Sequence, residues 1–129
     1  MKPMDILLVD DEKGYVDVLA NRLARRSIRA VKALGGTQAI QALRKQDFNA
    51  VVLDLKMEDM DGMEVLKIMK KMVPELPVIL LTGHGSMEAA KEGLKLGAFD
   101  CLTKPCELSD LMEKIKSAVS TPPHNKEFS

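Results

Sequence analysis

Four short apolar runs in this chain each lead into a side chain that can handle phosphate or a metal ion. The runs are Ile6–Val9 before Asp10 and Asp11, Ala50–Leu53 before Asp54, Val78–Leu81 before Thr82, and Cys101–Thr103 before Lys104. Runs this short and this apolar are typical of buried strands in a parallel sheet. Because ligands in open α/β sheets bind beyond the carboxyl ends of the strands, we expect these acids, the hydroxyl and the ammonium to converge on one small site.

Apolar residues at helical spacing separate these runs, so strands and helices should alternate along the chain. Such an alternation predicts an α/β fold, a doubly wound five-stranded parallel sheet with right-handed crossovers. The expected strands cover residues 6–9, 28–33, 50–53, 77–81 and 98–102. The expected helices cover 12–26, a segment ending near 46–47, a segment ending before Pro74, a segment from a Ser86 cap to Gly97, and 109–119. We expect one domain over residues 1–119, and a flexible tail or truncated linker over the polar, proline-bearing residues 120–129.

Composition narrows the classes of function. The 129 residues include 19 basic and 19 acidic side chains, which argues against a free-standing binder of nucleic acid or of a membrane surface. The N-terminus does not resemble a signal peptide and no apolar run has the length of a membrane span, so the cytoplasm is the expected location. Cys101 and Cys106 lack companion His or Cys residues, and are expected to be reduced apolar fillers.

The three acids define the expected chemistry. Carboxylates of Asp10, Asp11 and Asp54 at neighbouring strand ends would repel one another, and a hard divalent cation such as Mg²⁺ would relieve the conflict. One carboxylate could then attack a phosphoryl group as a nucleophile. Lys104 could offset charge on the phosphoryl oxygens, and Thr82 could donate a hydrogen bond to one of them.

Each of these residues also fits a structural role on its own. Asp10 and Asp11 could cap the first helix, Asp54 could be a turn acid, Thr82 could satisfy a loop amide, and Lys104 could be a solvated turn lysine. The functional interpretation is favoured because all four strand ends carry compatible groups.

The pattern resembles the receiver domains of bacterial two-component response regulators over roughly residues 4–119. The motifs that carry the resemblance are Leu7–Glu12, Val52–Leu55, Met60–Gly62, Leu81–Thr82 and Lys104–Pro105. The resemblance implies the flavodoxin-like (βα)5 fold with strand order 2-1-3-4-5. It also implies a signalling domain that catalyses only its own phosphorylation and dephosphorylation, rather than a metabolic enzyme.

By this resemblance Asp54 would be the phosphoacceptor and Asp11 a direct Mg²⁺ ligand, with Mn²⁺ able to substitute. Asp10 would act mainly through metal-bound water, and the backbone carbonyl of Lys56 would be a further ligand.

The remaining roles also follow from the resemblance. Thr82 would be the switch hydroxyl and Lys104 would pair with a phosphoryl oxygen. A cis peptide bond before Pro105 would aim the lysine, and Gly62 would allow a tight turn into the third helix.

Three residues depart from the common family pattern. Glu58 replaces a proline, which predicts a looser and more negative loop after the acceptor. Cys101 replaces the aromatic residue that usually follows the switch hydroxyl, and Cys106 replaces a phenylalanine. His84 lies two residues after Thr82, and Lys56 lies two residues after Asp54. The side chain of each could modulate the loss of the phosphoryl group, and each could equally be an exposed loop residue without that role.

The resemblance implies a sensor histidine kinase or phosphotransfer protein as donor. It implies output through the face of the fourth helix, fifth strand and fifth helix, to an effector domain or through a homodimer. We expect neither nucleic acid nor membrane to bind this domain directly. A stand-alone regulator and a fragment of a longer protein both remain open.

Three other functions compete with this one. A pseudo-receiver acting as a constitutive adaptor is favoured slightly by the missing aromatic at Cys101, but the complete set of site residues opposes it. A Mg²⁺-dependent phosphatase would need a second acid where Lys56 stands. A flavodoxin-like cofactor binder would need a phosphate loop after the first strand, where none is present.

Overall fold

Strands and helices alternate without exception along the part of the chain that the structure, a computed structural model, describes: residues 4–83 and 87–120. The strands are β1 (Met4–Val9), β2 (Ile28–Ala33), β3 (Ala50–Asp54), β4 (Val78–Thr82) and β5 (Asp100–Thr103). The helices are α1 (Lys13–Ala24), α2 (Gly36–Lys45), α3 (Gly62–Met72), α4 (Met87–Lys95) and α5 (Leu108–Ser120). The predicted α/β class is therefore confirmed.

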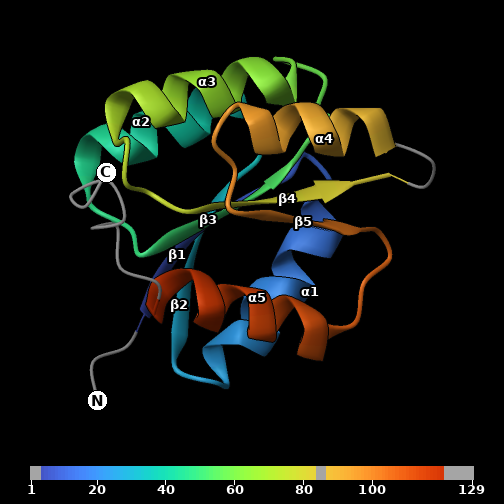
Figure 1. The fold of residues 1–129 in the computed structure, drawn as a ribbon. Coiled ribbons are helices and arrows are strands. Elements are labelled where there is room, and N and C mark those ends of the chain that lie inside the picture. Colours follow the sequence, from blue (N-terminus) through green and yellow to red (C-terminus); the bar gives the residue numbers. More distant parts are fainter. Residues whose placement is uncertain (1–3, 84–86, 121–129) are drawn as a thin grey trace.

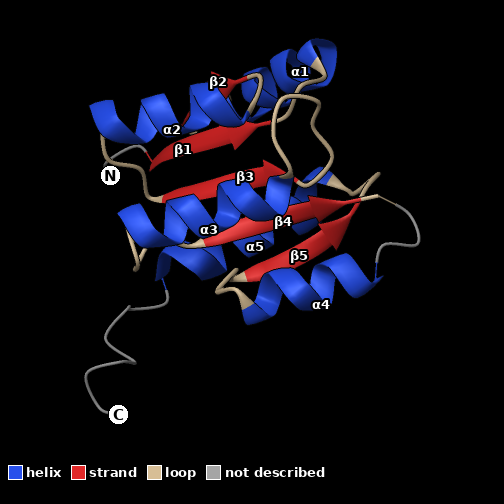
Figure 2. Cartoon of the chain, turned by 90° about the horizontal axis from the view of Figure 1, so that it is seen from above, coloured by secondary structure: helices blue, strands red, loops and turns tan. Residues whose placement is uncertain are grey.

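The five strands form one sheet in the order β2-β1-β3-β4-β5, and every neighbouring pair is parallel. This is the expected flavodoxin-like order, and Figure 2 shows the strands side by side with their arrowheads at the same edge. The order reverses at β1, so β1 and β3 are the neighbours whose connections leave toward opposite sides of the sheet. In such sheets a ligand site is expected beyond this reversal.

The core has two halves, one on each face of the sheet. Successive side chains of a strand point to opposite faces, so Ile6 and Leu8 pack with α1 and α5, while Leu7 and Val9 pack with α2 and α3. Figure 1 shows the same division, with α1 and α5 below the sheet and α2, α3 and α4 above it. Burial on both faces explains why β1, β3 and β4 are continuous apolar runs rather than alternating ones.

The fifth strand was predicted to start at residue 98, and it starts two residues later, at Asp100. Gly97 adopts a φ of +107°, and the amide of Ala98 donates to the carbonyl of Gly93. Ala98 therefore belongs to the C-terminal cap of α4, for which the left-handed glycine is the usual device.

Other differences lie at the start of β1, which begins at Met4 rather than at residue 6, and at helix ends and faces. Helix α1 ends at Ala24 rather than near residue 26, because the chain turns there into Ser27, which has a φ of 63°. The helical spacing of apolar residues predicts that Met72, Leu108 and Val119 face the core, but all three are only half-buried. The predicted cap Ser86, together with His84, lies outside the described residues.

Gly62 matters for its lack of a side chain rather than for an unusual φ. A Cβ built at this residue would lie 2.6 Å from both the Cα and the carbonyl oxygen of Leu55. The start of α3 therefore lies directly against the backbone that leaves β3, and this contact closes the loop after Asp54. Neighbouring Asp61 caps α3 by accepting a hydrogen bond from the Met63 amide at 3.1 Å.

Replacing Gly62 with Ala should lower the free energy of unfolding by about 2 kcal/mol or more, because backbone atoms of Leu55 cannot rotate away from the added methyl group. Urea denaturation measures the change. Gly14→Ala is the matched control, since Gly14 also lies in the first turn of a helix but a Cβ there meets nothing within 4 Å. That variant should be neutral or more stable by up to about 1 kcal/mol, and equal losses in both would contradict the steric account.

Candidate functional site

Three carboxylates meet at the carboxyl edge of the sheet, where the sequence predicted them. Asp10 and Asp11 follow β1, and Asp54 ends the neighbouring strand β3. One oxygen of each lies within 4.8 Å of the others. Asp10 is fully buried and Asp54 is 5% exposed, so water can do little to screen their mutual repulsion.

Lys104 supplies the positive charge at the centre of this group. It directly follows β5, and its Nζ lies 2.7 Å from Asp10 Oδ2, 3.2 Å from Glu12 Oε1 and 3.8 Å from Asp54 Oδ2. Burial lowers the pKa of Lys104, but the hydrogen bond to Asp10 and the charge of Asp54 outweigh burial, so the pKa lies above its ordinary value. The Lys104–Pro105 peptide bond is cis, as expected.

The carboxyl group of Asp54 has a raised pKa. Burial raises its pKa to about 6, and the charge of Asp10 adds to this, while Lys104 acts in the opposite direction. A carboxylate with this pKa is ionised near neutral pH, but its negative charge is only partly balanced by nearby positive charge. Such a group is a good candidate for a nucleophile that a cation would stabilise.

Thr82 ends β4 beside the acids and is 3% exposed. Its hydroxyl donates a long hydrogen bond of 3.5 Å to the carbonyl of Leu102 on β5. Next to it, the Lys104 amide donates to the Thr82 carbonyl at 2.7 Å, so the ends of β4 and β5 are held together. The hydroxyl is thus near the site and weakly held, and it can turn toward a new acceptor without losing a strong hydrogen bond.

The loop between β3 and α3 is tied to two other parts of the molecule. The Glu58 amide donates to Asp11 Oδ2 at 3.0 Å. The carboxylate of Asp59 accepts from the amides of Gly36 and Thr37, at 3.0 and 3.1 Å, and so caps α2. These bonds lower the pKa of Asp59. The loop is therefore better tethered than its missing proline led us to expect.

The donor set fits a hard divalent cation. A cavity of about 310 Å³ is lined by six residues, Asp11, Glu12, Asp54, Lys56, Gly83 and Lys104. Carboxylate oxygens at its wall, with Asp10 behind them, are the ligands that Mg²⁺ and Mn²⁺ prefer, and the open side leaves room for water and a phosphoryl group. Lys56 has an exposed side chain at the rim, with its backbone next to Asp54.

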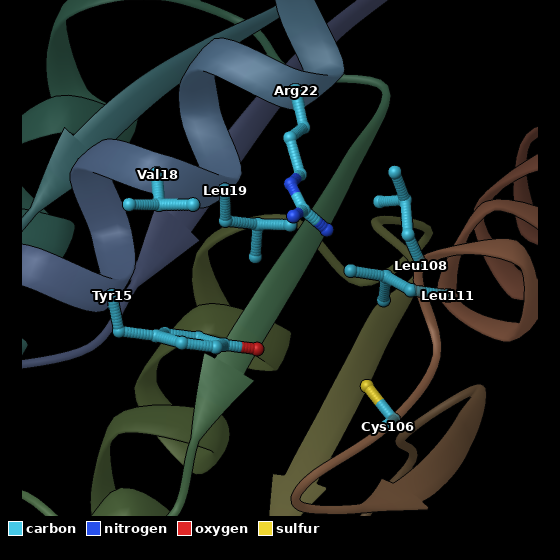
Figure 3. Close-up of a pocket in the computed structure, with 7 residues that line it drawn as sticks. All are labelled: Tyr15, Val18, Leu19, Arg22, Cys106, Leu108 and Leu111. Atoms are coloured by element: carbon cyan, nitrogen blue, oxygen red, sulfur yellow. The ribbon is translucent and has the colours of Figure 1, made fainter.

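Sequence reasoning missed two neighbours of Lys104, which are Glu12 and Tyr15. The Lys104 Nζ lies 4.6 Å from the centre of the Tyr15 ring, within range of a cation–π contact. Tyr15 lies in the first turn of α1, two residues after that helix begins at Lys13. Figure 3 shows the ring beside a hollow between α1 and the start of α5, with the Cys106 sulfur facing the same space.

The cysteines behave as the sequence predicted. Both are free and half-buried, and Cys106 packs against the α1–α5 half of the core while Cys101 packs against the other half. Burial raises the pKa of each thiol, which keeps it protonated at neutral pH. No helix within 4–83 or 87–120 has the length and apolar character needed to cross a bilayer.

Comparison with known proteins identifies a family and several relatives that this chain resembles in sequence. A family model described as the response regulator receiver domain matches residues 6–116. The chain is 36% identical over 118 residues to the transcriptional regulatory protein GlrR of Escherichia coli K12, covering 92% of this chain and 27% of that protein. It is 35% identical over 120 residues to a putative NtrX-like response regulator of Rickettsia felis, covering 92% of this chain and 25% of that protein.

A solved structure agrees with these matches. NtrX from Brucella abortus superimposes with a TM-score of 0.90 and 31% identity, over 98% of this chain and 29% of that chain. The chain therefore spans about a quarter of the length of these curated relatives, 25–27% of each protein.

Replacing Asp54 with Asn should stabilise the metal-free protein near neutral pH by about 1–3 kcal/mol. The substitution removes the buried charge of a carboxyl group whose pKa rises from 3.8 in the unfolded chain to about 6 in the folded protein. Between these two values the native state holds the proton more tightly than the unfolded chain, so wild-type stability falls as pH rises. The advantage of the variant should therefore be small below about pH 4 and complete above about pH 6. Urea denaturation across this range in the presence of a chelator measures the difference, and a pH-independent difference would contradict it.

Proposed function

The chain belongs to the response regulator receiver domain family, and on that premise we propose that Asp54 accepts a phosphoryl group from a sensor histidine kinase or a phosphotransfer protein. The observation that carries the proposal is the setting of Asp54. It lies buried between two further acids, with its Oδ2 atom 3.8 Å from the Lys104 ammonium and facing a cavity of about 310 Å³.

In the proposed reaction a carboxylate oxygen of Asp54 attacks the phosphorus of a phosphohistidine. The new P–O bond forms as the P–N bond breaks, and the leaving imidazole nitrogen keeps the electron pair and takes up a proton. Asp54 is ionised near neutral pH because its pKa is about 6. Lys104 then shifts its ammonium from Asp10 toward a phosphoryl oxygen and offsets its charge.

Mg²⁺ would be held by Asp11, Asp54 and the Lys56 carbonyl, with Asp10 acting mainly through metal-bound water, and it would neutralise charge on the phosphoryl oxygens when bound. Repulsion among the acids supports this assignment, because Lys104 contacts Asp10 and Asp54 but leaves Asp11 without a cationic partner among the described residues. Mn²⁺ has the same ligand preferences and would substitute.

Thr82 is the proposed switch residue. Its hydroxyl would leave the long hydrogen bond to Leu102 and donate to the phosphoryl group, which would favour one of two arrangements of the chain after β4. The output would pass to the face of α4, β5 and α5, for an effector domain or a homodimer. Exposed Met87 and Leu94 on α4 give this face apolar contact area, while half-buried Cys101 replaces the usual aromatic reporter.

Incubation with acetyl phosphate and Mg²⁺ should add the mass of one phosphoryl group to the intact protein. The adduct should be absent with a chelator and absent in Asp54→Asn, because both the cation and the nucleophile are required. Intact-mass spectrometry reads the result directly. Asp47→Asn is the matched control, since it removes an exposed acid outside the site and should leave the adduct in place.

An adduct that persists in Asp54→Asn would contradict the choice of acceptor. A folded wild-type protein that takes no phosphoryl group from acetyl phosphate or from a phosphohistidine donor would contradict the proposed function and favour a constitutive adaptor.

A further inference from the structure

One carboxylate of the acidic cluster, that of Asp11, accepts a hydrogen bond from a backbone amide in a distant loop. The Glu58 N–H donates to Asp11 Oδ2 at 3.0 Å, across 47 residues of sequence. Within residues 4–83 and 87–120 this is the one hydrogen bond assigned to the Asp11 carboxylate. The side chain of Glu58 is exposed, so the residue reaches the site through its backbone rather than its charge.

Asp10 is held quite differently. Its two oxygens accept hydrogen bonds from the Glu12 amide at 2.9 Å and from the Lys104 ammonium at 2.7 Å. Asp10 is thus fully buried and fixed at both oxygens, while Asp11 is half-buried and depends on one amide. A carboxylate has two oxygens, so Asp11 can accept this amide on one and offer the other to a cation.

The amide is itself rigidly placed. One residue further on, Asp59 binds the N-terminal amides of α2 at 3.0 and 3.1 Å. Asp61 then caps α3, and Gly62 lies against the backbone of Leu55. The Glu58 N–H is therefore presented by a loop fixed at both α2 and α3, and it does not need the metal to find its position.

We propose that the backbone amide of Glu58 is a positioning group for the metal ligand Asp11, holding its carboxylate toward Asp10 and Asp54 before the cation arrives. The inference rests on the metal site proposed above and adds a residue that this site had left unused. The cation then meets an ordered ligand, so less side-chain freedom is lost on binding. A proline at this position could not supply the hydrogen bond because it has no N–H.

The test compares two variants that both remove the Glu58 carboxylate. Glu58→Ala keeps the backbone N–H and Glu58→Pro removes it, so their difference isolates the amide from the charge. Binding of Mn²⁺, followed by electron paramagnetic resonance of the free ion, should be weaker in Glu58→Pro than in Glu58→Ala by about threefold to tenfold. Calorimetry with Mg²⁺ should give the same ranking.

A kinetic readout separates positioning from a general structural defect. The Mg²⁺ concentration that gives half-maximal phosphorylation by acetyl phosphate should rise in Glu58→Pro, while the rate at saturating Mg²⁺ should match that of Glu58→Ala. If the proline distorts the loop, replacing the Glu58 amide with an ester by semisynthesis removes the same N–H and should weaken the metal to a similar extent.

The outcomes distinguish this inference from the function on which it rests. Wild-type protein that binds the cation together with equal affinities in the proline, ester and alanine forms would overturn the role of the amide and leave the proposed function intact. Wild-type protein that binds no cation would overturn both.

Discussion

The rest of the site depends on the electrostatic conflict created by burying carboxylates side by side. Asp10 and Asp54 lie almost fully out of water at the ends of adjacent strands, and Asp11 lies next to them. Hydrophobic burial of β1 and β3 on both faces brings these acids together whether or not their charges are compensated. Lys104 balances only part of the charge, and the pKa of Asp54 stays raised to about 6. A divalent cation would neutralise the remaining excess of negative charge and would then allow a phosphoryl group to bind.

Different hydrogen-bond donors hold the different carboxylates in place. Lys104 and the Glu12 amide fix Asp10, while the loop after β3 fixes Asp11 through the Glu58 amide. That loop depends in turn on Asp59 at the start of α2, so three separate connections of the sheet share one hydrogen-bond network. A change in the loop would therefore displace the proposed metal ligands without altering any of those residues. The weak hydrogen bond of Thr82 is the exception, which would suit the switch role proposed for this residue.

Most of the fold and the main site residues could be predicted from the sequence, since both follow from one regularity. Parallel strands buried on both faces are continuous apolar runs, and their carboxyl ends meet at one edge, so Asp10, Asp54 and Lys104 converge whatever the details of packing. The start of β5 was misplaced because the left-handed turn at Gly97 gives Ala98 to the cap of α4. Tyr15 was missed because its contact with Lys104 depends on how α1 packs against the sheet. The role of the Glu58 amide was missed although the replacement of a proline at this position was visible, because a residue type shows that a backbone N–H is present but not which acceptor it meets.

The most direct test of this account is a pH titration of the Asp54 carboxyl carbon by NMR, with and without Mg²⁺. Without metal the titration midpoint should lie at about 6, because burial and the charge of Asp10 oppose ionisation. Mg²⁺ should move the midpoint downward, since a bound cation stabilises the carboxylate. A midpoint in the ordinary range near about 4 that ignores Mg²⁺ would contradict the claim that a buried charge conflict organises the site.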